Sequence, residues 1–373
     1  MTADPGSTVW GFALDLVAGL GAQGVEVVLA TLGSKPCSSQ RRDIRAIPNV
    51  LVAESDYRLE WMQDPWEDVR VSGDWLLTLA SRYAVDVVHC NHLVHANLPW
   101  DVPVLTVGHS CALSWTEATF GAVGSEWDRY AQEVGASLRA ANAVVAPSRA
   151  MLANLEQHYG PITDGAVIHS ACRPMPHASL RKEPRILAVG RLTDESKGFD
   201  QLNSIAPSLS WPIHIAGATG GNTSAPVSMP NVELLGSLTT RALSSWFKRA
   251  AVFALPSKYE PSGLTVLNAA RAGCALVLGD IPALRELWDG AALFVPTDDE
   301  AAVASALQSL IDDPQQRAVL ARAARQRALT YGYERCVREY LLAYRVLRGG
   351  YERLYDGVRE APYVSLAQVG TGD

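Results

Sequence analysis

The stretch "KYEPSGLTVLNAARAGCALVLGDIPALREL", residues 258–287, contains the local signals that decide the fold. Glycine and proline mark a turn before "LTVLNAARAG", whose apolar spacing predicts a helix with one face on a core. Gly273 suits the position after a helix end, and "CALVLGD" (274–280) is typical of a fully buried parallel strand. Glu260, Ser262 and Gly263 therefore lie in a loop before a helix N-terminus. The unpaired backbone N–H groups and positive dipole of such an end favour phosphate.

Composition narrows the class of protein. The chain has 373 residues, 48% of them hydrophobic and 19% charged, which suits a globular protein of two domains. Its net charge of −7 argues against nucleic acid or an anionic membrane as partner. No run of eighteen apolar residues and no signal-peptide pattern occurs, and the six cysteines are scattered as reduced thiols would be. We therefore expect a cytoplasmic protein without integral membrane contact.

Short apolar runs alternate with helical patterns along most of the chain, which predicts an α/β fold with parallel sheets covered by helices on both faces. The runs before the Pro-rich segment lie at 25–33, 49–55, 85–90, 102–108, 141–148 and 165–170. Those after it lie at 184–190, 211–218, 232–236, 250–257, 274–280 and 291–296. We expect two doubly wound domains that face a cleft, with ligands at the carboxyl ends of the strands.

The domain boundaries follow from this pattern. We predict an N-terminal domain over 1–172, a linker over 173–183, a second domain over 184–345, and a helix end and tail over 346–373. The first helical pattern begins by about residue 8, so "MTAD" leaves room for only the end of a preceding strand. We therefore expect the natural reading frame to start upstream of Met1.

The segment "VGRLTDESKGFD" carries two cations just after a predicted strand. Arg191 offers a planar fork and Lys197 a compact charge, and together they can neutralise a diphosphate. The alternative is that both are solvated loop cations. Glu260 can hold sugar hydroxyls, or it can simply complement the dipole of the helix that follows.

Together, "GRL…KG" and "ALPSKYEPSGLTVLNAARAG…VLGDIPALREL…AALFVPTDD" resemble the donor domain of retaining GT-B glycosyltransferases, the large family with bacterial mannosyl- and glucosyltransferases and sucrose-synthase-type enzymes. The resemblance implies a GT-B fold of two Rossmann-like domains with C-terminal helices. It also implies a nucleotide-sugar donor, UDP- or GDP-linked, and catalysis without a metal or other cofactor. The catalytic residues that it implies are His109, Arg191, Lys197 and Glu260. The implied substrate-binding residues are Gly6, Ser7, Gly190, Ser262, Gly263, Leu264, Thr265 and Asn268.

One family position differs in this chain. The second acidic residue of the family's E-x7-E motif, which holds the ribose hydroxyls, falls on Asn268. An amide can still hydrogen-bond a ribose diol, but without the assistance of a charge. The resemblance therefore predicts the fold better than it predicts the strength of nucleotide binding.

In the first half, "VPVLTVGHS" ends a predicted strand with His109, where the family often has a histidine that faces the donor sugar and the acceptor. Such a histidine could donate to a sugar hydroxyl or to phosphate, or it could be satisfied by local backbone. "DPGST" (4–8) occupies the place of the family's glycine-rich loop, and Gly6 permits close approach of a ligand.

Two further clusters have alternative interpretations. "VVHCNHLVH" contains histidines and a cysteine, which are common metal ligands, but no second cluster of ligands accompanies it. We therefore expect this segment to be a strand end that lines the cleft. Seven of the ten tryptophans occur by residue 127, densest in "RLEWMQDPWEDVRVSGDW". They could form a platform for an acceptor sugar, although tryptophans buried between helices are more common.

The sequence thus predicts a retaining glycosyltransferase that moves a sugar to a hydroxyl of a soluble sugar-like or small-molecule acceptor. A soluble acceptor is expected because "QRRDIR" is the nearest approach to a basic membrane-docking cluster. Three alternatives stay open at this point: a nucleotide-sugar epimerase of the same fold, a non-catalytic nucleotide-sugar-binding protein, and an NAD-linked enzyme. The last is disfavoured because no G-x-G-x-x-G follows a strand.

Overall fold

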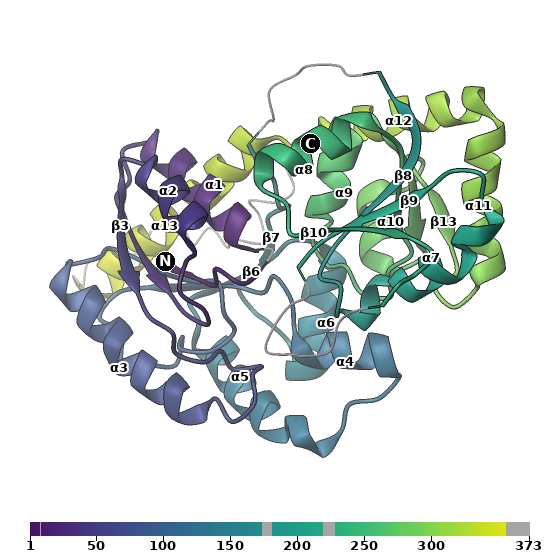
Figure 1. Cartoon of the computed structure of the whole chain (residues 1–373). Coiled ribbons are helices and arrows are strands. Elements are labelled where there is room, and N and C mark those ends of the chain that lie inside the picture. The colour runs from purple at the N-terminus through teal and green to yellow at the C-terminus, as the bar shows by residue number, and fades with distance from the viewer. Residues whose placement is uncertain (8, 174–180, 219–227, 356–373) are drawn as a thin grey trace. The chain divides into compact units, whose positions relative to one another are not determined.

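The computed structural model describes residues 1–7, 9–173, 181–218 and 228–355, with the backbone alone for 350–355. The chain divides into two compact units (Figure 1). Unit 1 consists of Met1–Glu117, Ala122–Arg173 and Tyr333–Asp373, and unit 2 of Pro174–Gly332 with Ala118–Gly121.

Unit 1 contains two parallel sheets, ordered β1-β2-β3 and β4-β5-β6-β7. Their strands are β1 (Thr2–Ala3), β2 (Val27–Thr31), β3 (Val50–Glu54), β4 (Val88–Cys90), β5 (Val104–Val107), β6 (Ala143–Ala146) and β7 (Gly165–Val167). The amide of Asn91, just after β4, joins the sheets: its backbone N–H donates to Thr2 Oγ1 at 2.9 Å and its Nδ2 to the Thr2 carbonyl at 2.7 Å. The carboxyl ends of β1 and β4 therefore lie together.

The helices of unit 1 pack their apolar stripes on these sheets. They are α1 (Val9–Gly21), α2 (Ser38–Arg45), α3 (Trp66–Arg82), α4 (Ala112–Phe120), α5 (Asp128–Ala140), α6 (Arg149–Tyr159) and α13 (Tyr333–Tyr355), and a 3-10 turn covers Ser125–Trp127. Phe12, Leu16 and Leu20 of α1 are fully buried, as expected for a helix with apolar residues on one stripe.

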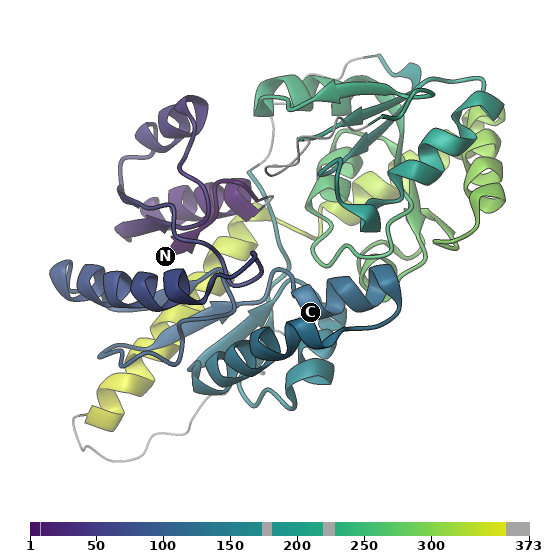
Figure 2. The same ribbon diagram turned by 60° about the horizontal axis from the view of Figure 1, so that its bottom comes forward.

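Unit 2 is one parallel sheet in the order β10-β9-β8-β11-β12-β13, with helices on both faces (Figure 2). The strands are β8 (Glu183–Val189), β9 (Ile213–Ala216), β10 (Glu233–Gly236), β11 (Ala250–Leu255), β12 (Ala275–Gly279) and β13 (Leu293–Val295). The helices are α7 (Phe199–Ile205), α8 (Thr240–Arg249), α9 (Leu264–Arg271), α10 (Pro282–Trp288), α11 (Glu300–Asp312) and α12 (Pro314–Ala328). Every residue of β11 and β12 is buried, which explains why both sequences are continuously apolar.

The predicted fold class is confirmed. Each of the twelve apolar runs contains a strand, and Gly273 follows α9 with a φ of +79°. Unit 1 has one strand outside these runs, β1, which contains only two residues. The expected linker at 173–183 falls largely on residues 174–180, outside the described residues, as does the tail from 356 onward.

The second domain was expected to extend to residue 345, but unit 2 ends at Gly332. The C-terminal helix α13 belongs to unit 1 from Tyr333 onward. The reason is close packing of α13 on α1, visible in both ribbon views (Figures 1 and 2). A Cβ at Gly19 would lie 2.4 Å from Val337 Cγ2, so only glycine permits this approach. The hydroxyl of Tyr333 also donates to the Asp15 carbonyl at 2.7 Å.

Candidate active site

Two loops of unit 2 meet where the adjacent strands β8 and β11 end. Ser257 Oγ donates to the Ser196 carbonyl at 3.1 Å, and the Lys258 N–H donates to the same carbonyl at 2.8 Å. Ser196 is fully buried, with its N–H and hydroxyl both bound to Asp194 Oδ1. These bonds hold the loop after β8 (190–198) against the loop after β11 (256–263).

Lys197 and Glu260 form an ion pair between these two loops. Lys197 Nζ lies 2.9 Å from Glu260 Oε2 and also donates to the Tyr259 carbonyl at 3.0 Å. The other carboxylate oxygen, Oε1, accepts from the Gly263 N–H at 3.0 Å and from Ser262 Oγ at 3.3 Å. Both side chains are only 12–13% exposed, so solvent screens the pair weakly. Glu260 is thus fixed by three partners, Lys197 of the loop after β8 and Ser262 and Gly263 of its own loop.

Glycines make this geometry possible. Gly263 caps α9 with a φ of +62°, and Gly198 precedes α7 with a φ of +69°. A Cβ at Gly198 would lie 2.6 Å from the Pro256 carbonyl oxygen. The two loops therefore approach each other through backbone that only glycine allows.

The remaining predicted residues of unit 2 lie around this pair. Gly190 directly follows β8, and its carbonyl comes so close to Gly217 that a side chain at Gly217 would collide with it. Arg191 follows β8 and is half-buried, and Leu264 and Thr265 form the first turn of α9. Asn268 lies one turn further along α9 and is half-buried. The first N–H groups of α9 have no intrahelical acceptor, so this end can bind an anion.

In unit 1, His109 lies just after β5 and binds Asn91. His109 Nε2 and His89 Nε2 lie 2.8 Å and 2.9 Å from Asn91 Oδ1. Because the Asn91 Nδ2 donates to Thr2, Oδ1 is the amide acceptor and both imidazoles must donate to it through Nε2. Phe12 packs edge-on against His109 with ring centroids 4.9 Å apart. The Nδ1 of His109 is then left as an acceptor. It can accept a hydrogen bond from a ligand hydroxyl, but the histidine is not arranged to donate a hydrogen bond to a phosphate.

Burial keeps these imidazoles neutral. It lowers the pKa of His109 to about 3, and it lowers the pKa of His92 to about 3 with the help of the nearby His95 and His109. Histidine in this environment serves as a neutral hydrogen-bonding group at physiological pH.

The predicted loop residues Gly6 and Ser7 are close to these strand ends. The Gly6 N–H donates to Asp4 Oδ1 at 2.7 Å. Ser7 Oγ donates to the Asp4 carbonyl at 3.0 Å and accepts from the Val9 N–H at 3.2 Å. Ser7 Oγ therefore accepts a hydrogen bond from the first N–H group of α1.

Glu60 is a residue of this region that sequence reasoning missed. It is 5% exposed, and its Oε1 accepts from the Leu93 N–H at 3.2 Å. Burial, and to a smaller extent the charge of Asp4, raises the pKa of Glu60. The one available signal was a glutamate inside the apolar sequence "RLEWM", which alone does not distinguish a buried carboxyl from an exposed one.

Among the described residues, no group of three or more His, Cys, Asp or Glu is arranged to hold a metal ion. His89 instead binds Tyr344 through Nδ1 at 2.6 Å, and His95 lies 2.9 Å from the Val69 carbonyl through Nε2. No helix in the described part of the chain is long and apolar enough to cross a bilayer.

Comparison with known proteins identifies the family. One family model, described as Glycosyltransferase Family 4, matches residues 11–172, and another, described as Glycosyl transferases group 1, matches residues 183–313. The solved structure of sucrose-phosphate synthase from Thermosynechococcus elongatus superposes with a TM-score of 0.71 over 92% of each chain at 18% identity. The chain belongs to the GT-B glycosyltransferases.

Two further proteins are similar to this chain. D-inositol 3-phosphate glycosyltransferase from Xylanimonas cellulosilytica is 26% identical over 307 residues, which cover 75% of this chain and 72% of that protein. The solved structure of Anabaena HepE in complex with UDP and glucose has a TM-score of 0.70 at 12% identity, covering 92% of this chain and 97% of that one.

Proposed function

We propose that this glycosyltransferase moves a sugar from a nucleoside diphosphate sugar to a hydroxyl of a soluble, sugar-like or small-molecule acceptor, with retention at the anomeric carbon. The observation that carries the proposal is the Lys197–Glu260 pair, which lies beside the N-terminus of α9 at the carboxyl ends of β8 and β11. This is the edge where doubly wound sheets bind ligands. The complex of HepE with UDP and glucose supports a nucleotide-linked donor.

In the proposed mechanism, the donor diphosphate binds against Arg191, Lys197 and the first N–H groups of α9. Negative charge grows on the diphosphate as the glycosidic bond breaks, and these groups stabilise it without a metal or another cofactor. Glu260 accepts hydrogen bonds from the donor sugar, and its fixed carboxylate orients that sugar. The leaving diphosphate takes the proton of the attacking hydroxyl on the same face, which retains the anomeric configuration.

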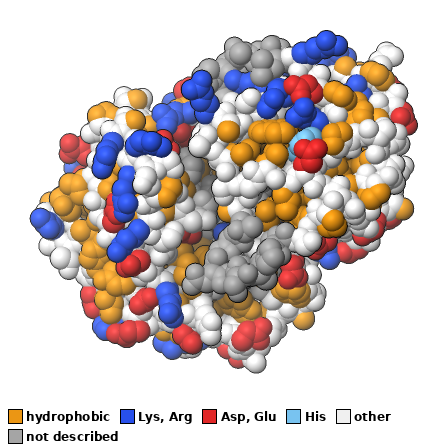
Figure 3. Space-filling model, in the orientation of Figure 1, with side chains coloured by type: hydrophobic (Ala, Val, Ile, Leu, Met, Phe, Trp, Pro, Cys, Tyr) orange, Lys and Arg blue, Asp and Glu red, His pale blue; other side chains and the backbone are white. Residues whose placement is uncertain are grey.

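The surface of unit 1 supports the proposal of a soluble acceptor. The most basic stretch is α2, and Arg41 within it forms two bonds to Glu54, at 2.9 Å and 2.6 Å. Figure 3 shows acidic side chains interspersed with basic ones on the visible face. A surface of mixed charge gives little attraction to an anionic bilayer, so a soluble acceptor is favoured. Strong, salt-sensitive sedimentation with anionic vesicles would count against it.

The test is release of UDP or GDP from a panel of nucleotide sugars, with and without hydroxylated acceptors. We expect acceptor-dependent release with one donor, and loss of it in Glu260→Gln. Glu300→Gln, an exposed glutamate at the start of α11, is the matched control and should keep full turnover. Isomerised donor in the absence of acceptor would favour an epimerase instead, and tight donor binding without turnover on any acceptor would also contradict the proposal.

A further inference from the structure

Two cysteines lie beside the points where the chain passes between the units. Apart from the short segment Ala118–Gly121, the chain leaves unit 1 after Arg173 and re-enters it at Tyr333. Cys172 immediately precedes the first crossing, and Cys336 lies one helical turn after the second, in α13. We propose that Cys172 and Cys336 form a reversible disulfide, which joins the two crossings covalently when the thiols are oxidised.

Asp15 of α1 binds residues at both crossings. Its carboxylate accepts two bonds from Arg173: the backbone N–H donates to Oδ2 at 2.9 Å, and the guanidinium Nε donates to Oδ1 at 2.6 Å. The Asp15 backbone carbonyl accepts from the Tyr333 hydroxyl at 2.7 Å. Because one residue of α1 binds both sides, the end of the segment before residue 174 and the start of α13 are held close together within unit 1.

The sulfur of Cys336 faces the segment that contains Cys172. Cys336 is 3% exposed, and Ala171 is 2% exposed. Burial raises the pKa of Cys336 to about 12, the backbone N–H of Ala171 lowers it to a smaller extent, and the Cys172 thiol raises it slightly further. A hydrogen bond from the Ala171 N–H reaches the Cys336 sulfur only at short range, so the two cysteines are neighbours across the crossings.

The oxidant in this proposal is a small disulfide such as oxidised glutathione. Cys172 is partly exposed, so its thiolate can attack one sulfur of that molecule and release one small thiol. The Cys336 thiolate then attacks the Cys172 sulfur and releases the second. Two cysteines are oxidised, one small disulfide is reduced to two thiols, and these thiols take both protons. The second step limits the rate, because a buried thiol with a raised pKa is seldom ionised.

The disulfide closes a loop that contains the whole of the chain between the crossings, residues 174–332, and this stretch forms nearly all of unit 2. Closing a long loop restricts the unfolded chain, so oxidation should stabilise unit 2 against unfolding. We expect its unfolding temperature to rise by roughly 5–10 °C when the disulfide forms.

The experiment equilibrates the full chain in mixtures of reduced and oxidised glutathione, then alkylates the remaining thiols and maps the peptides by mass spectrometry. The reference chain carries Cys37→Ser, because Cys37 is exposed and can itself take up glutathione. We expect a cross-linked peptide that contains Cys172 and Cys336 and that dithiothreitol separates. In Cys336→Ser, Cys172 should instead keep a bound glutathione. Cys274→Ser, which alters a buried cysteine of unit 2, is the control and should oxidise as the reference does.

A second variant tests the role of Asp15 in holding the crossings together. Asp15→Asn loses a charge-assisted bond to Arg173, and the equilibrium constant for the disulfide should fall about tenfold. Asp128→Asn, an exposed aspartate at the start of α5, is the matched control and should leave that constant unchanged. The inference would be overturned by the absence of the linked peptide in fully oxidised glutathione, by linkage of Cys172 to a different cysteine, by an equal constant in Asp15→Asn, or by an unfolding temperature that oxidation does not raise.

Discussion

Glu260 and Asn268 lie eight residues apart, the first in a loop and the second in α9, and we expect them to contact different parts of the donor. Glu260→Gln should leave nucleotide affinity unchanged but lower turnover roughly a hundredfold, because its contact is with the sugar that moves. Asn268→Ala should instead weaken nucleoside diphosphate binding by about 0.5–1.5 kcal/mol, and Asn268→Glu should tighten it. Calorimetry with UDP and GDP measures these affinities, and unchanged values in both Asn268 variants would mean that the ribose is held elsewhere.

The buried histidines predict how unit 1 responds to acid. The pKa of His92 and of His109 is about 3 in the folded protein, against about 6.5 when unfolded, so the unfolded chain binds more protons between these values. The free energy of unfolding should therefore fall as the pH drops from about 6.5 toward 3, by up to about 1.4 kcal/mol per pH unit for each histidine. His109→Gln should reduce the slope of the free energy of unfolding against pH by the amount that corresponds to about one bound proton. Hydrogen exchange in β5 and β6 across this pH range measures the free energy of unfolding of unit 1. A free energy that does not change between pH 7 and pH 5 would contradict the account.

Among the structural elements, the turn from β8 into α7 decides whether the two donor loops can meet. Gly198 and Gly290 have φ values of +69° and +73° in the same unit, but only Gly198 has backbone within reach of an added Cβ. Gly290→Ala should cost about 1–2 kcal/mol, the strain of a left-handed residue. Gly198→Ala should cost more and also weaken nucleotide binding, since its methyl group would push Pro256 away. Thermal unfolding with and without UDP distinguishes them, and equal effects would show that contact between the loops is unimportant.

The elements themselves could be predicted because each has a local cause. "AAVFALPS" and "CALVLGD" are apolar throughout since β11 and β12 are covered on both faces, and Gly273 follows α9 because the chain must turn left-handed there. The pairing of Lys197 with Glu260 is not local. The sequence placed both residues near one ligand, but their ion pair depends on how β8 and β11 align in the sheet.

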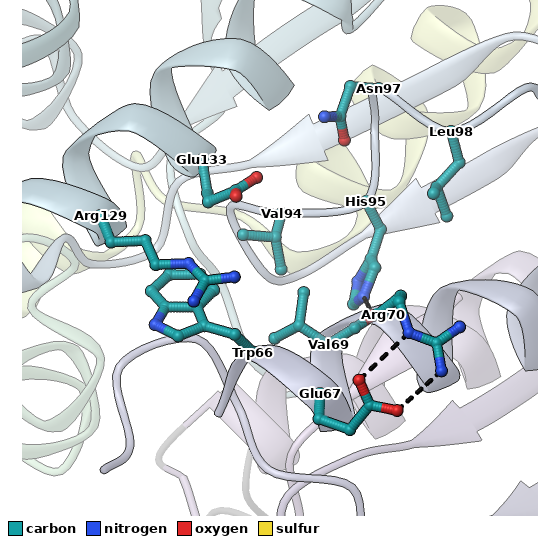
Figure 4. Close-up of a pocket in the computed structure, with 10 residues that line it drawn as sticks. All are labelled: Trp66, Glu67, Val69, Arg70, Val94, His95, Asn97, Leu98, Arg129 and Glu133. Carbon is teal, nitrogen blue, oxygen red and sulfur yellow. Dashed lines mark hydrogen bonds and ion pairs between the residues drawn. The ribbon is translucent and has the colours of Figure 1, made fainter. Parts of the chain in front are cut away.

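Across the whole molecule, the main surprise is that α13 joins unit 1. An amphipathic pattern predicts that a helix buries one face, but not which core receives it. The partner is visible only in the fold, where Tyr340 lies 5.5 Å from His89 and 6.0 Å from Phe12 between ring centroids. A pocket of about 470 Å³ between α3, α5 and the segment 94–98 (Figure 4) was unpredictable for the same reason, because the segments that line it are far apart in sequence.

This assignment of α13 makes a prediction about the two units. Tyr340→Ala removes a 1% exposed aromatic side chain and should destabilise unit 1 by about 3–5 kcal/mol. Unit 2 has its own sheet and core and should be unaffected. Hydrogen exchange resolved by peptide should show lost protection in β5 and β6 with unchanged protection in β11 and β12. Equal loss in both units would mean that they unfold together.

The central claim is that the Lys197–Glu260 site transfers a donor sugar with retention, and the anomeric configuration of the product tests it most directly. The measurement is proton NMR of the product formed from an α-linked nucleotide sugar and a hydroxylated acceptor, compared between the unaltered chain and Glu260→Gln. We predict an α-linked product, formed at least about a hundredfold more slowly by the variant. A β-linked product, or equal rates in the two proteins, would contradict the account.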